Sequence, residues 1–277
     1  FERTHWLSSV YVGKEEVSKI DYISIPHNHE LTQWLHPGKK ELITFCIDNR
    51  YQYDTHKWDH AHSEFTQINW NGVLGEIKLV AVDPVYVDDM QVYPDIKNKS
   101  IKVKMTVRNC TEHTASGKIS FHVTGKDYRL QKEVPVTVTD SITYIEEEMF
   151  LGKDIHLWNE FHPNLYTLDC KLTSSVEGQS YAHEKSTTFG MREVEAGEDH
   201  IILNGEPIHL RGTVENAVFP KTGYAPVDDA SWERVLRILK EYGMNHMRFH
   251  SWCPPAAAFR MADKLGVYLE VGNADVG

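Results

Sequence analysis

Arginine, histidine, tyrosine and glutamate side chains occupy alternate positions of three short apolar runs in the last quarter of the chain. The runs cover residues 208–211, 247–250 and 267–271. Successive side chains of a strand point to opposite faces, so each run would carry one apolar and one polar face. The polar face would hold His209, Arg211, His246, Arg248, His250, Tyr268 and Glu270. Such a face could gather catalytic groups or form an internal ion network, and alternation alone does not separate the two.

Two helices are predicted between these runs. Asp228 or Asp229 could cap the first, and Gly243 fits its end. Its apolar stripe would be Trp232, Val235, Leu236, Leu239 and Tyr242. The second helix would follow a Pro-Pro pair, run over 256–265 and end at Gly266. The order is therefore β-α-β-α-β, which implies parallel strands with helical crossovers.

The alternation in the three runs bears on the fold class. A doubly wound sheet is covered by helices on both faces, and its strands read as nearly continuous apolar runs. One apolar and one polar face instead suit the wall of a TIM (β/α)8 barrel near its mouth, where catalytic groups gather at the C-terminal strand ends. We therefore expect the first βαβαβ part of such a barrel.

Composition limits the classes of function. The chain has 277 residues, enough for about two domains, with 41% hydrophobic and 25% charged residues. Its net charge of -11 argues against a nucleic-acid partner, because such proteins usually show a basic footprint. No apolar run approaches the length of a membrane span, so no membrane partner is expected. No signal peptide opens the sequence, and Phe1 is not expected to be the natural start.

Cysteine and histidine spacings give no metal signature. The four cysteines lie far apart and are interpreted as buried free thiols: Cys46, Cys110, Cys170 and Cys253. His56, His60 and His62 could surround a metal, but no carboxylate or cysteine signature accompanies them. We therefore interpret them as surface or hydrogen-bonded histidines and expect neither a metal nor a cofactor.

The first 88 residues have a β-rich pattern. Strands are predicted at 6–12, 41–47 and 75–82. A long loop over 48–71 separates the last two and carries Trp58, Phe65 and Trp70. Loops of this length in a compact domain are usually functional or disordered, and the aromatic residues argue against disorder.

Residues 89–189 are predicted to form a second β domain. Alternating runs cover 101–107, 118–123, 133–138, 142–150, 165–173 and 180–188, with turns expected at Gly117, Gly125, Gly152 and Gly178. Six or seven short strands in about 100 residues are typical of a β-sandwich. The chain then enters its β/α part, from residue 190, through a hairpin with the two-residue turn Asn204-Gly205.

Five phrases, at residues 70–77, 162–168, 204–212, 245–250 and 262–269, together resemble glycoside hydrolase family 2. This is the family of β-galactosidases, β-glucuronidases and β-mannosidases. The resemblance spans essentially the whole chain in the family's domain order. It implies a multidomain chain with part of a sugar-binding jelly-roll sandwich (1–88), an immunoglobulin-like sandwich (89–189) and the start of a TIM barrel (190–277).

The resemblance also implies a sugar pocket. The implied substrate-binding residues are Arg211, Asn216, Arg248, His250, Trp252, Asn69 and Trp70. Asn216 falls where several relatives have histidine, which puts galactosidase specificity in doubt. The implied partner is a β-glycoside, a homo-oligomer is compatible, and a periplasmic or secreted location is slightly favoured.

The resemblance implies a retaining mechanism with two glutamates, an acid/base after the fourth barrel strand and a nucleophile on the seventh. Retention needs those carboxyl groups about 5–5.5 Å apart. Glu215 and Glu270 match neither catalytic motif, and ion pairing with arginine explains them better. We therefore expect both catalytic glutamates to lie beyond this sequence and the chain itself to be inactive.

Two other functions remain open from the sequence. One is a non-catalytic carbohydrate-binding or structural β-sandwich protein, although the inward arginines and histidines of the β/α part have no evident use there. The other is metal-dependent hydrolysis by His209, His246 and His250, which share one strand face. No carboxylate completes that set at a familiar spacing.

Overall fold

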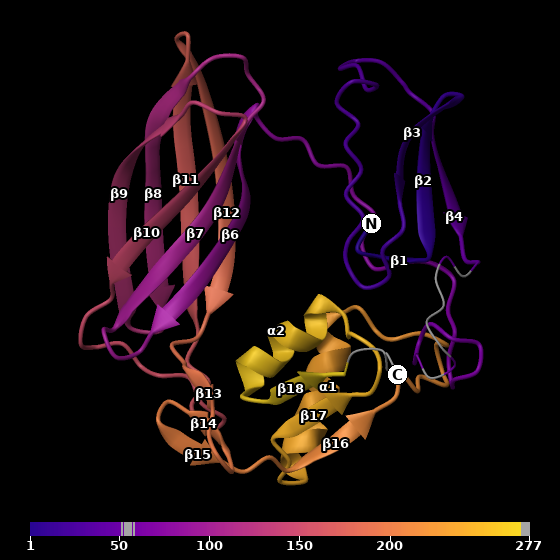
Figure 1. The fold of residues 1–277 in the computed structure, drawn as a ribbon, viewed down its shortest axis with the longest axis vertical. Helices are drawn as coiled ribbons and strands as arrows, with labels where there is room; N and C mark the ends of the chain where they lie inside the picture. The colour runs from indigo at the N-terminus through magenta and orange to yellow at the C-terminus, as the bar shows by residue number, and fades with distance from the viewer. Residues whose placement is uncertain (51, 53–56, 58, 273–277) are drawn as a thin grey trace. The chain divides into compact units, whose positions relative to one another are not determined.

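The computed structural model describes residues 1–50, 52, 57 and 59–272. Its contacts divide the chain into two compact units. The first unit combines Phe1–Leu79 with Leu210–Gly277, and the second is Val80–His209 (Figure 1). The chain is mostly β-sheet with two helices among the described residues.

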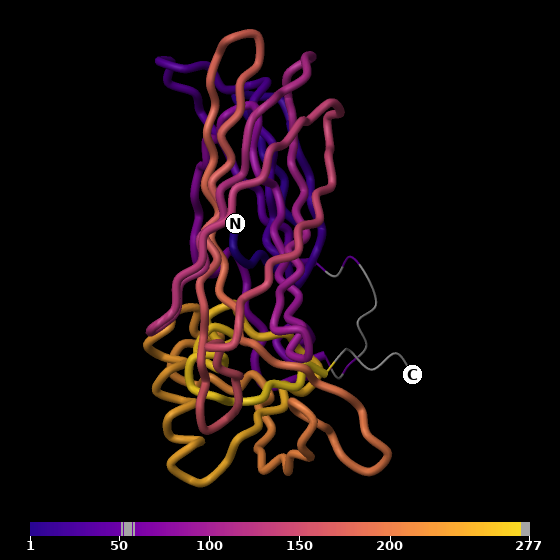
Figure 2. Tube along the Cα trace, turned by 90° about the vertical axis from the view of Figure 1, so that its left-hand side faces the viewer, coloured from indigo at the N-terminus to yellow at the C-terminus, as the bar shows by residue number. Residues whose placement is uncertain are grey.

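The second unit is built on a two-sheet β-sandwich. One antiparallel sheet has the order β10-β7-β6 and the other β12-β11-β8-β9. The strands run alongside one another in both views (Figure 1, Figure 2). Their bounds are β6 Val85–Asp95, β7 Ser100–Asn109, β8 Ala115–Gly125, β9 Tyr128–Val138, β10 Ile142–Phe150, β11 Tyr166–Val176 and β12 Gln179–Phe189. The predicted β-sandwich is thus confirmed.

Side-chain alternation explains why these strands pack as two layers. In β7 the side chains of Ile101, Val103, Met105 and Val107 are buried, whereas Lys102 and Lys104 between them are exposed. The predicted turn at Gly117 is wrong, because this glycine lies inside β8. A Cβ atom there would lie 2.0 Å from the Thr173 carbonyl oxygen, so the close approach of β11 requires glycine.

A short three-stranded sheet follows the sandwich within the second unit. It consists of β13 (Val194–Ala196), β14 (Ile201–Leu203) and β15 (Glu206–Ile208). Asn204 and Gly205 have φ angles of 54° and 86°, which confirms the predicted two-residue turn. The Asn204 Nδ2 also donates to the Trp158 carbonyl oxygen at 3.0 Å.

The first unit contains a parallel sheet of the order β16-β17-β18. Its strands are β16 Gly212–Glu215, β17 His246–Phe249 and β18 Tyr268–Val271. The predicted run at 208–211 is therefore wrong, because Ile208 ends β15 and the parallel strand begins at Gly212. The βαβαβ order is confirmed, but a TIM barrel is not evident in the described part of the chain.

The two helices begin and end where the sequence predicts. In α1 (Asp229–Glu241) the Asp228 side chain accepts from the Ser231 amide at 2.8 Å. α2 (Ala256–Leu265) ends at Gly266 with a φ of 71°. The predicted stripe of α1 fails at Tyr242, which is 78% exposed. Neither helix is long and apolar enough to cross a membrane.

The N-terminal part of the first unit holds two antiparallel sheets. One has the order β3-β2-β4 and the other pairs β1 with β5. Their bounds are β1 Arg3–His5, β2 Leu7–Val12, β3 Glu15–Ile20, β4 Ile43–Asp48 and β5 Gly72–Leu74. The predicted strand at 75–82 is wrong, since that segment joins no sheet and leaves Leu79 and Val80 70% and 65% exposed.

Candidate functional site

The C-terminal ends of β16 and β17 bring polar groups to one edge of the parallel sheet. His250 follows β17, and its backbone amide donates to the Glu215 carbonyl oxygen at 3.0 Å. The Trp252 Nε1 donates to the same oxygen at 3.2 Å. Parallel strands end at the same edge, so the residues after β16 and β17 lie together there.

The loop before β5 packs against this edge. Ala61 and Trp70 belong to the same buried hydrophobic cluster as Ala217 and Trp252. The burial of these side chains fixes the loop beside the strand ends. It places the His60 ring 5.0 Å from the His250 ring between centroids, with their Nδ1 atoms 3.4 Å apart.

Strand β1 adds an arginine and a histidine to the same region. Arg3 is 7% exposed, and its Nη2 donates to the Cys253 carbonyl oxygen at 2.6 Å. The His5 Nδ1 contacts the Trp70 carbonyl oxygen. Burial lowers the pKa of both Arg3 and His5. Burial, assisted by the nearby His5 and Arg3, lowers the pKa of His62 to about 3. At neutral pH His62 is therefore an uncharged imidazole.

The polar face of the parallel sheet is an exposed ion network. The Arg248 Nε lies 3.2 Å from Glu270 Oε1, and the His246 Nε2 lies 3.5 Å from Glu270 Oε2. Met247 and Phe249, on the opposite face, are buried. The alternation predicted for β17 and β18 is confirmed, and of the two interpretations an ion network describes these contacts.

Glu215 and Glu270 lie on opposite faces of the sheet. Glu215 is opposite Phe249 in the register, whereas Glu270 is opposite Arg248. The Glu215 carboxylate accepts from the backbone amides of Ala217 and Val218 at 2.9 and 3.2 Å. Burial raises the pKa of Glu215, and these two bonds oppose the rise. The two carboxyl groups therefore do not form a facing pair.

The predicted site residues divide into two groups. Trp70 and Trp252 belong to one buried cluster beside the strand-end edge, while His250 follows β17 and Asn216 follows β16 at that edge. The buried Asn216 Oδ1 has no hydrogen-bond partner in the described ranges. Arg211 precedes β16 and is exposed, with its Nε donating to the Gly243 carbonyl oxygen at 2.9 Å. The others, Arg248 and Asn69, are also exposed.

Sequence reasoning missed Arg3, His5, His60 and His62 as components of this region. The sequence predicts His60 and His62 as surface or hydrogen-bonded histidines, with a metal site as the alternative, whereas both side chains are buried, each with 6% exposed. Within the described ranges, no group of three histidine, cysteine or acidic side chains could hold a metal ion. His56 lies outside the described residues, so the structure does not bear on its part in that pattern.

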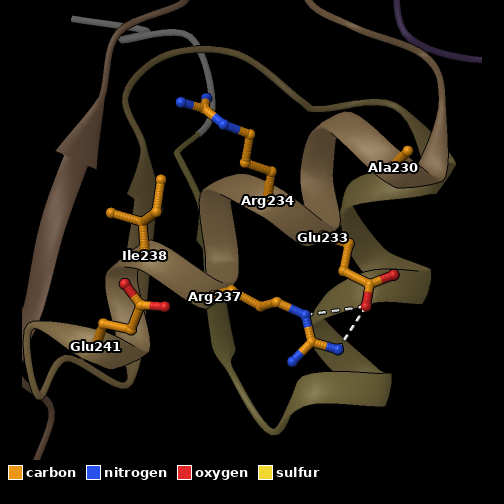
Figure 3. Close-up of a pocket in the computed structure, with 6 residues that line it drawn as sticks. All are labelled: Ala230, Glu233, Arg234, Arg237, Ile238 and Glu241. Atoms are coloured by element: carbon orange, nitrogen blue, oxygen red, sulfur yellow. Dashed lines mark hydrogen bonds and ion pairs between the residues drawn. The ribbon is translucent and has the colours of Figure 1, made fainter.

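A shallow hollow on α1 lies apart from these residues. It is lined by Ala230, Glu233, Arg234, Arg237, Ile238 and Glu241 (Figure 3). Glu233 and Arg237 are bonded to each other across one helical turn, with 2.5 Å between Arg237 Nη2 and Glu233 Oε1. This is a solvated helix surface, and we assign it no function.

Comparisons with known proteins identify relatives of the chain. The model for glycosyl hydrolases family 2 matches residues 85–192. A β-galactosidase of Oenococcus oeni is 24% identical over 95% of this chain and 25% of its own length. One from Thermoanaerobacter pseudethanolicus is 23% identical over 97% of this chain and 36% of its own length. The chain is thus similar to members of glycoside hydrolase family 2.

Solved structures of glycoside-hydrolysing proteins share the fold. Bacteroides uniformis β-glucuronidase 2, bound covalently to cyclophellitol-6-carboxylate aziridine, gives a TM-score of 0.78 at 17% identity over 99% of this chain and 33% of that one. A family 2 member from Bacteroides cellulosilyticus gives 0.76 at 18% identity over 97% of this chain and 36% of that one. The chain thus spans about a quarter to a third of the length of most of these relatives.

Proposed function

We propose that this chain belongs to glycoside hydrolase family 2 and is part of a retaining β-glycosidase that hydrolyses terminal β-linked sugars. The observation that carries the proposal is the extent of the match to β-galactosidases, which covers 95% of the chain and so includes both units. A shared β-sandwich alone would not support an activity, because one fold hosts many functions.

The proposal includes a domain assignment. Residues 1–88 would belong to a sugar-binding jelly roll, 89–189 to an immunoglobulin-like sandwich and 190–277 to the start of a TIM barrel. The parallel order β16-β17-β18 supports the barrel assignment. In this assignment the edge at Glu215 and His250 faces the mouth of the barrel, where active sites of this fold lie.

The sugar would bind at that edge. Trp252, His250 and Asn216 would contribute from the barrel, and Trp70 with Asn69 from the first domain. Arg211 and Arg248 are assigned to the rim of the pocket, because both are exposed. Among the described residues, the buried Asn216 Oδ1 has no hydrogen-bond donor. Burying an acceptor without a donor costs folding free energy, so this atom supports a ligand that donates a hydrogen bond to it.

The two catalytic glutamates are proposed to come from sequence beyond this chain. Glu215 and Glu270 do not qualify, because a retaining pair must face each other across about 5–5.5 Å and these side chains lie on opposite faces. The chain would therefore bind a β-glycoside weakly and not hydrolyse it.

The test combines turnover with binding. The purified chain, with its intact mass checked against 31.9 kDa, is assayed on nitrophenyl β-galactoside, β-glucuronide and β-mannoside. We expect no turnover. In saturation-transfer NMR we expect transfer from the protein to methyl β-glycosides and less transfer to the matching α-glycosides. Turnover that is lost in Glu215→Gln or Glu270→Gln would contradict the assignment of the glutamates. No saturation transfer to any glycoside would contradict the pocket.

The second candidate is a non-catalytic carbohydrate-binding protein. It would give the same binding result, so a longer form of the protein containing the complete barrel decides between them. Hydrolysis of a β-glycoside by that form with retention of anomeric configuration supports the enzyme. Binding without hydrolysis supports the second candidate.

A further inference from the structure

The contact between His60 and His250 restricts the state of both rings. Their Nδ1 atoms are 3.4 Å apart, and the rings meet at 77° in an edge arrangement. A hydrogen bond between two ring nitrogens needs one donor and one acceptor. One imidazole therefore carries its proton on Nδ1 and the other does not. The tautomer of His250 is then determined by that of His60.

The tautomer of His250 determines what its Nε2 can do. If its Nδ1 accepts from His60, its Nε2 carries a hydrogen and donates; if its Nδ1 donates, its Nε2 accepts. The other polar neighbour recorded for the His250 ring is the Ser251 Oγ, 3.5 Å from the same Nδ1. No hydrogen bond reaches its Nε2 from the described residues. The ring is half-buried at the end of β17, so a ligand at the strand-end edge could contact that nitrogen.

His60 is held in place by its surroundings, so its own tautomer can determine that of His250. It is 6% exposed, and the adjacent Ala61 is packed in the same cluster as Trp70 and Trp252. A loop anchored by buried apolar side chains cannot rotate its histidine freely. His250 is fixed on the other side by its backbone bond to the Glu215 carbonyl oxygen at 3.0 Å.

The charges around the pair favour an uncharged ligand. The Arg3 guanidinium is buried and donates to the Cys253 carbonyl oxygen. His62 is neutral, because burial lowers its pKa to about 3. Arg248 is paired with Glu270 on the exposed sheet face. A sugar carboxylate would lose water at this edge without gaining an unpaired cation from these three groups, whereas a hydroxyl can pair with an imidazole nitrogen.

We propose that His60 is a positioning residue which fixes the His250 tautomer, so that His250 Nε2 binds a hydroxyl of an uncharged β-linked sugar in preference to a uronate. This inference rests on the proposed function for its ligand and on the described geometry for the histidine pair. It narrows the substrate class, because both β-galactosidases and β-glucuronidases are among the relatives.

The test follows the ring nitrogens of His250 directly. In the chain labelled with 15N-histidine, long-range 1H–15N correlations at pH 8 report the tautomer of each imidazole. His60→Phe keeps a ring of similar size without nitrogen, His60→Asn restores a hydrogen-bonding side chain, and His122→Phe changes an exposed histidine of the other unit as the control. His250→Gln assigns the signal.

We expect one dominant His250 tautomer in the wild type and in His122→Phe, a mixture in His60→Phe, and a return to one tautomer in His60→Asn. A merely structural role for His60 would leave the tautomer unchanged. An unchanged tautomer in a folded His60→Phe variant would overturn the positioning role. If that variant does not fold, the same comparison is made with His60→Ala, which also removes the ring nitrogens, and an unchanged tautomer in His60→Ala overturns the role.

Addition of methyl β-galactopyranoside should shift the His250 Nε2 signal, and methyl β-glucuronide should not. His60→Phe should weaken galactoside binding about fivefold, as expected for one misplaced hydrogen bond. An equal shift with the glucuronide would overturn the preference for an uncharged sugar. If no sugar shifts any signal, the proposed function and the sugar contact fail together, whereas the tautomers measured without sugar still decide the role of His60.

Discussion

Glu215 is a half-buried glutamate whose carboxylate accepts hydrogen bonds from two backbone amides of the turn after β16. Its pKa is raised chiefly by burial, so the folded unit binds the proton more tightly than the unfolded chain does. The contribution of this tighter proton binding to the folding free energy is fully present below the ordinary glutamate pKa. It is lost as pH rises through the raised pKa of Glu215. Glu215→Gln should therefore gain stability relative to wild type between pH 5 and pH 8 in urea denaturation.

Glu215→Ala supplies the matched comparison at this position. It removes both acceptors of the Ala217 and Val218 amides, and we expect it to cost about 1–3 kcal/mol at pH 5. If the difference between Glu215→Gln and wild type does not change with pH, the carboxylate does not titrate differently in the folded state and its burial has no energetic consequence.

Ser8 connects two histidines in a directional chain of hydrogen bonds. The His27 Nε2 donates to the Tyr22 carbonyl oxygen at 2.7 Å, which leaves its Nδ1 to accept from the Ser8 hydroxyl at 2.6 Å. The Ser8 oxygen then accepts from the His29 Nε2 at 2.9 Å, and the His29 Nδ1 accepts from Ser18. Every member is satisfied only while both imidazoles are neutral.

This chain predicts a loss of stability in acid. Burial lowers the pKa of His29 from 6.5 to about 4. The contribution of neutral His29 to the free energy of unfolding is therefore complete above pH 6.5 and is lost as pH falls toward 4. Ser8→Ala should cost about 1–3 kcal/mol at pH 7.5, because it leaves buried histidine nitrogens without partners, and less at pH 4.5. Ser9→Ala, in the same strand, is the control. An equal cost for Ser8→Ala at both pH values would contradict the chain.

At the scale of elements, the cap of α1 can be assigned to one of two adjacent aspartates. The Asp228 Oδ1 accepts from the Ser231 amide, and this bond lowers the pKa of Asp228, whereas Asp229 pairs with Arg260. Asp228→Ala should cost about 1 kcal/mol in the unfolding of the first unit. Asp229→Ala should cost less, because exposed ion pairs contribute little. The reverse order in urea denaturation would identify Asp229 as the cap.

Sequence patterns predicted elements well where local signals agree. Both helices have a capping aspartate or proline at the start and a glycine at the end, and both were found within two residues. The strands of the sandwich alternate over about ten residues, which leaves little doubt about their faces. Gly117 was misplaced because its role is a close approach to Thr173, a contact distant in sequence.

Short runs were predicted less well because distant partners decide them. Residues 208–211 and 212–215 both alternate, and pairing with β17 selects Gly212–Glu215 as the parallel strand. The run at 75–82 alternates but finds no partner strand. Dependence on distant partners also explains why part of the candidate site was not predicted. Nothing local in Arg3, His5 or His60 indicates that they lie beside the end of β17.

At the scale of the whole molecule, each unit has its own hydrophobic core. One buried cluster lies entirely within Val80–His209, and the other entirely within the first unit. Leu172 and Leu236 are each fully buried, one in each cluster. The cooperative unit of unfolding is therefore expected to be smaller than the chain.

This division predicts that core substitutions act within one unit. Leu172→Ala and Leu236→Ala should each destabilise their own unit by about 2–5 kcal/mol, the range for a buried leucine cut to alanine. Hydrogen exchange measured by mass spectrometry should show faster exchange across β11 for Leu172→Ala and across α1 for Leu236→Ala. Each variant is the control for the other. If either substitution accelerates exchange equally in both elements, the units unfold together and the two cores stabilise a single cooperative structure.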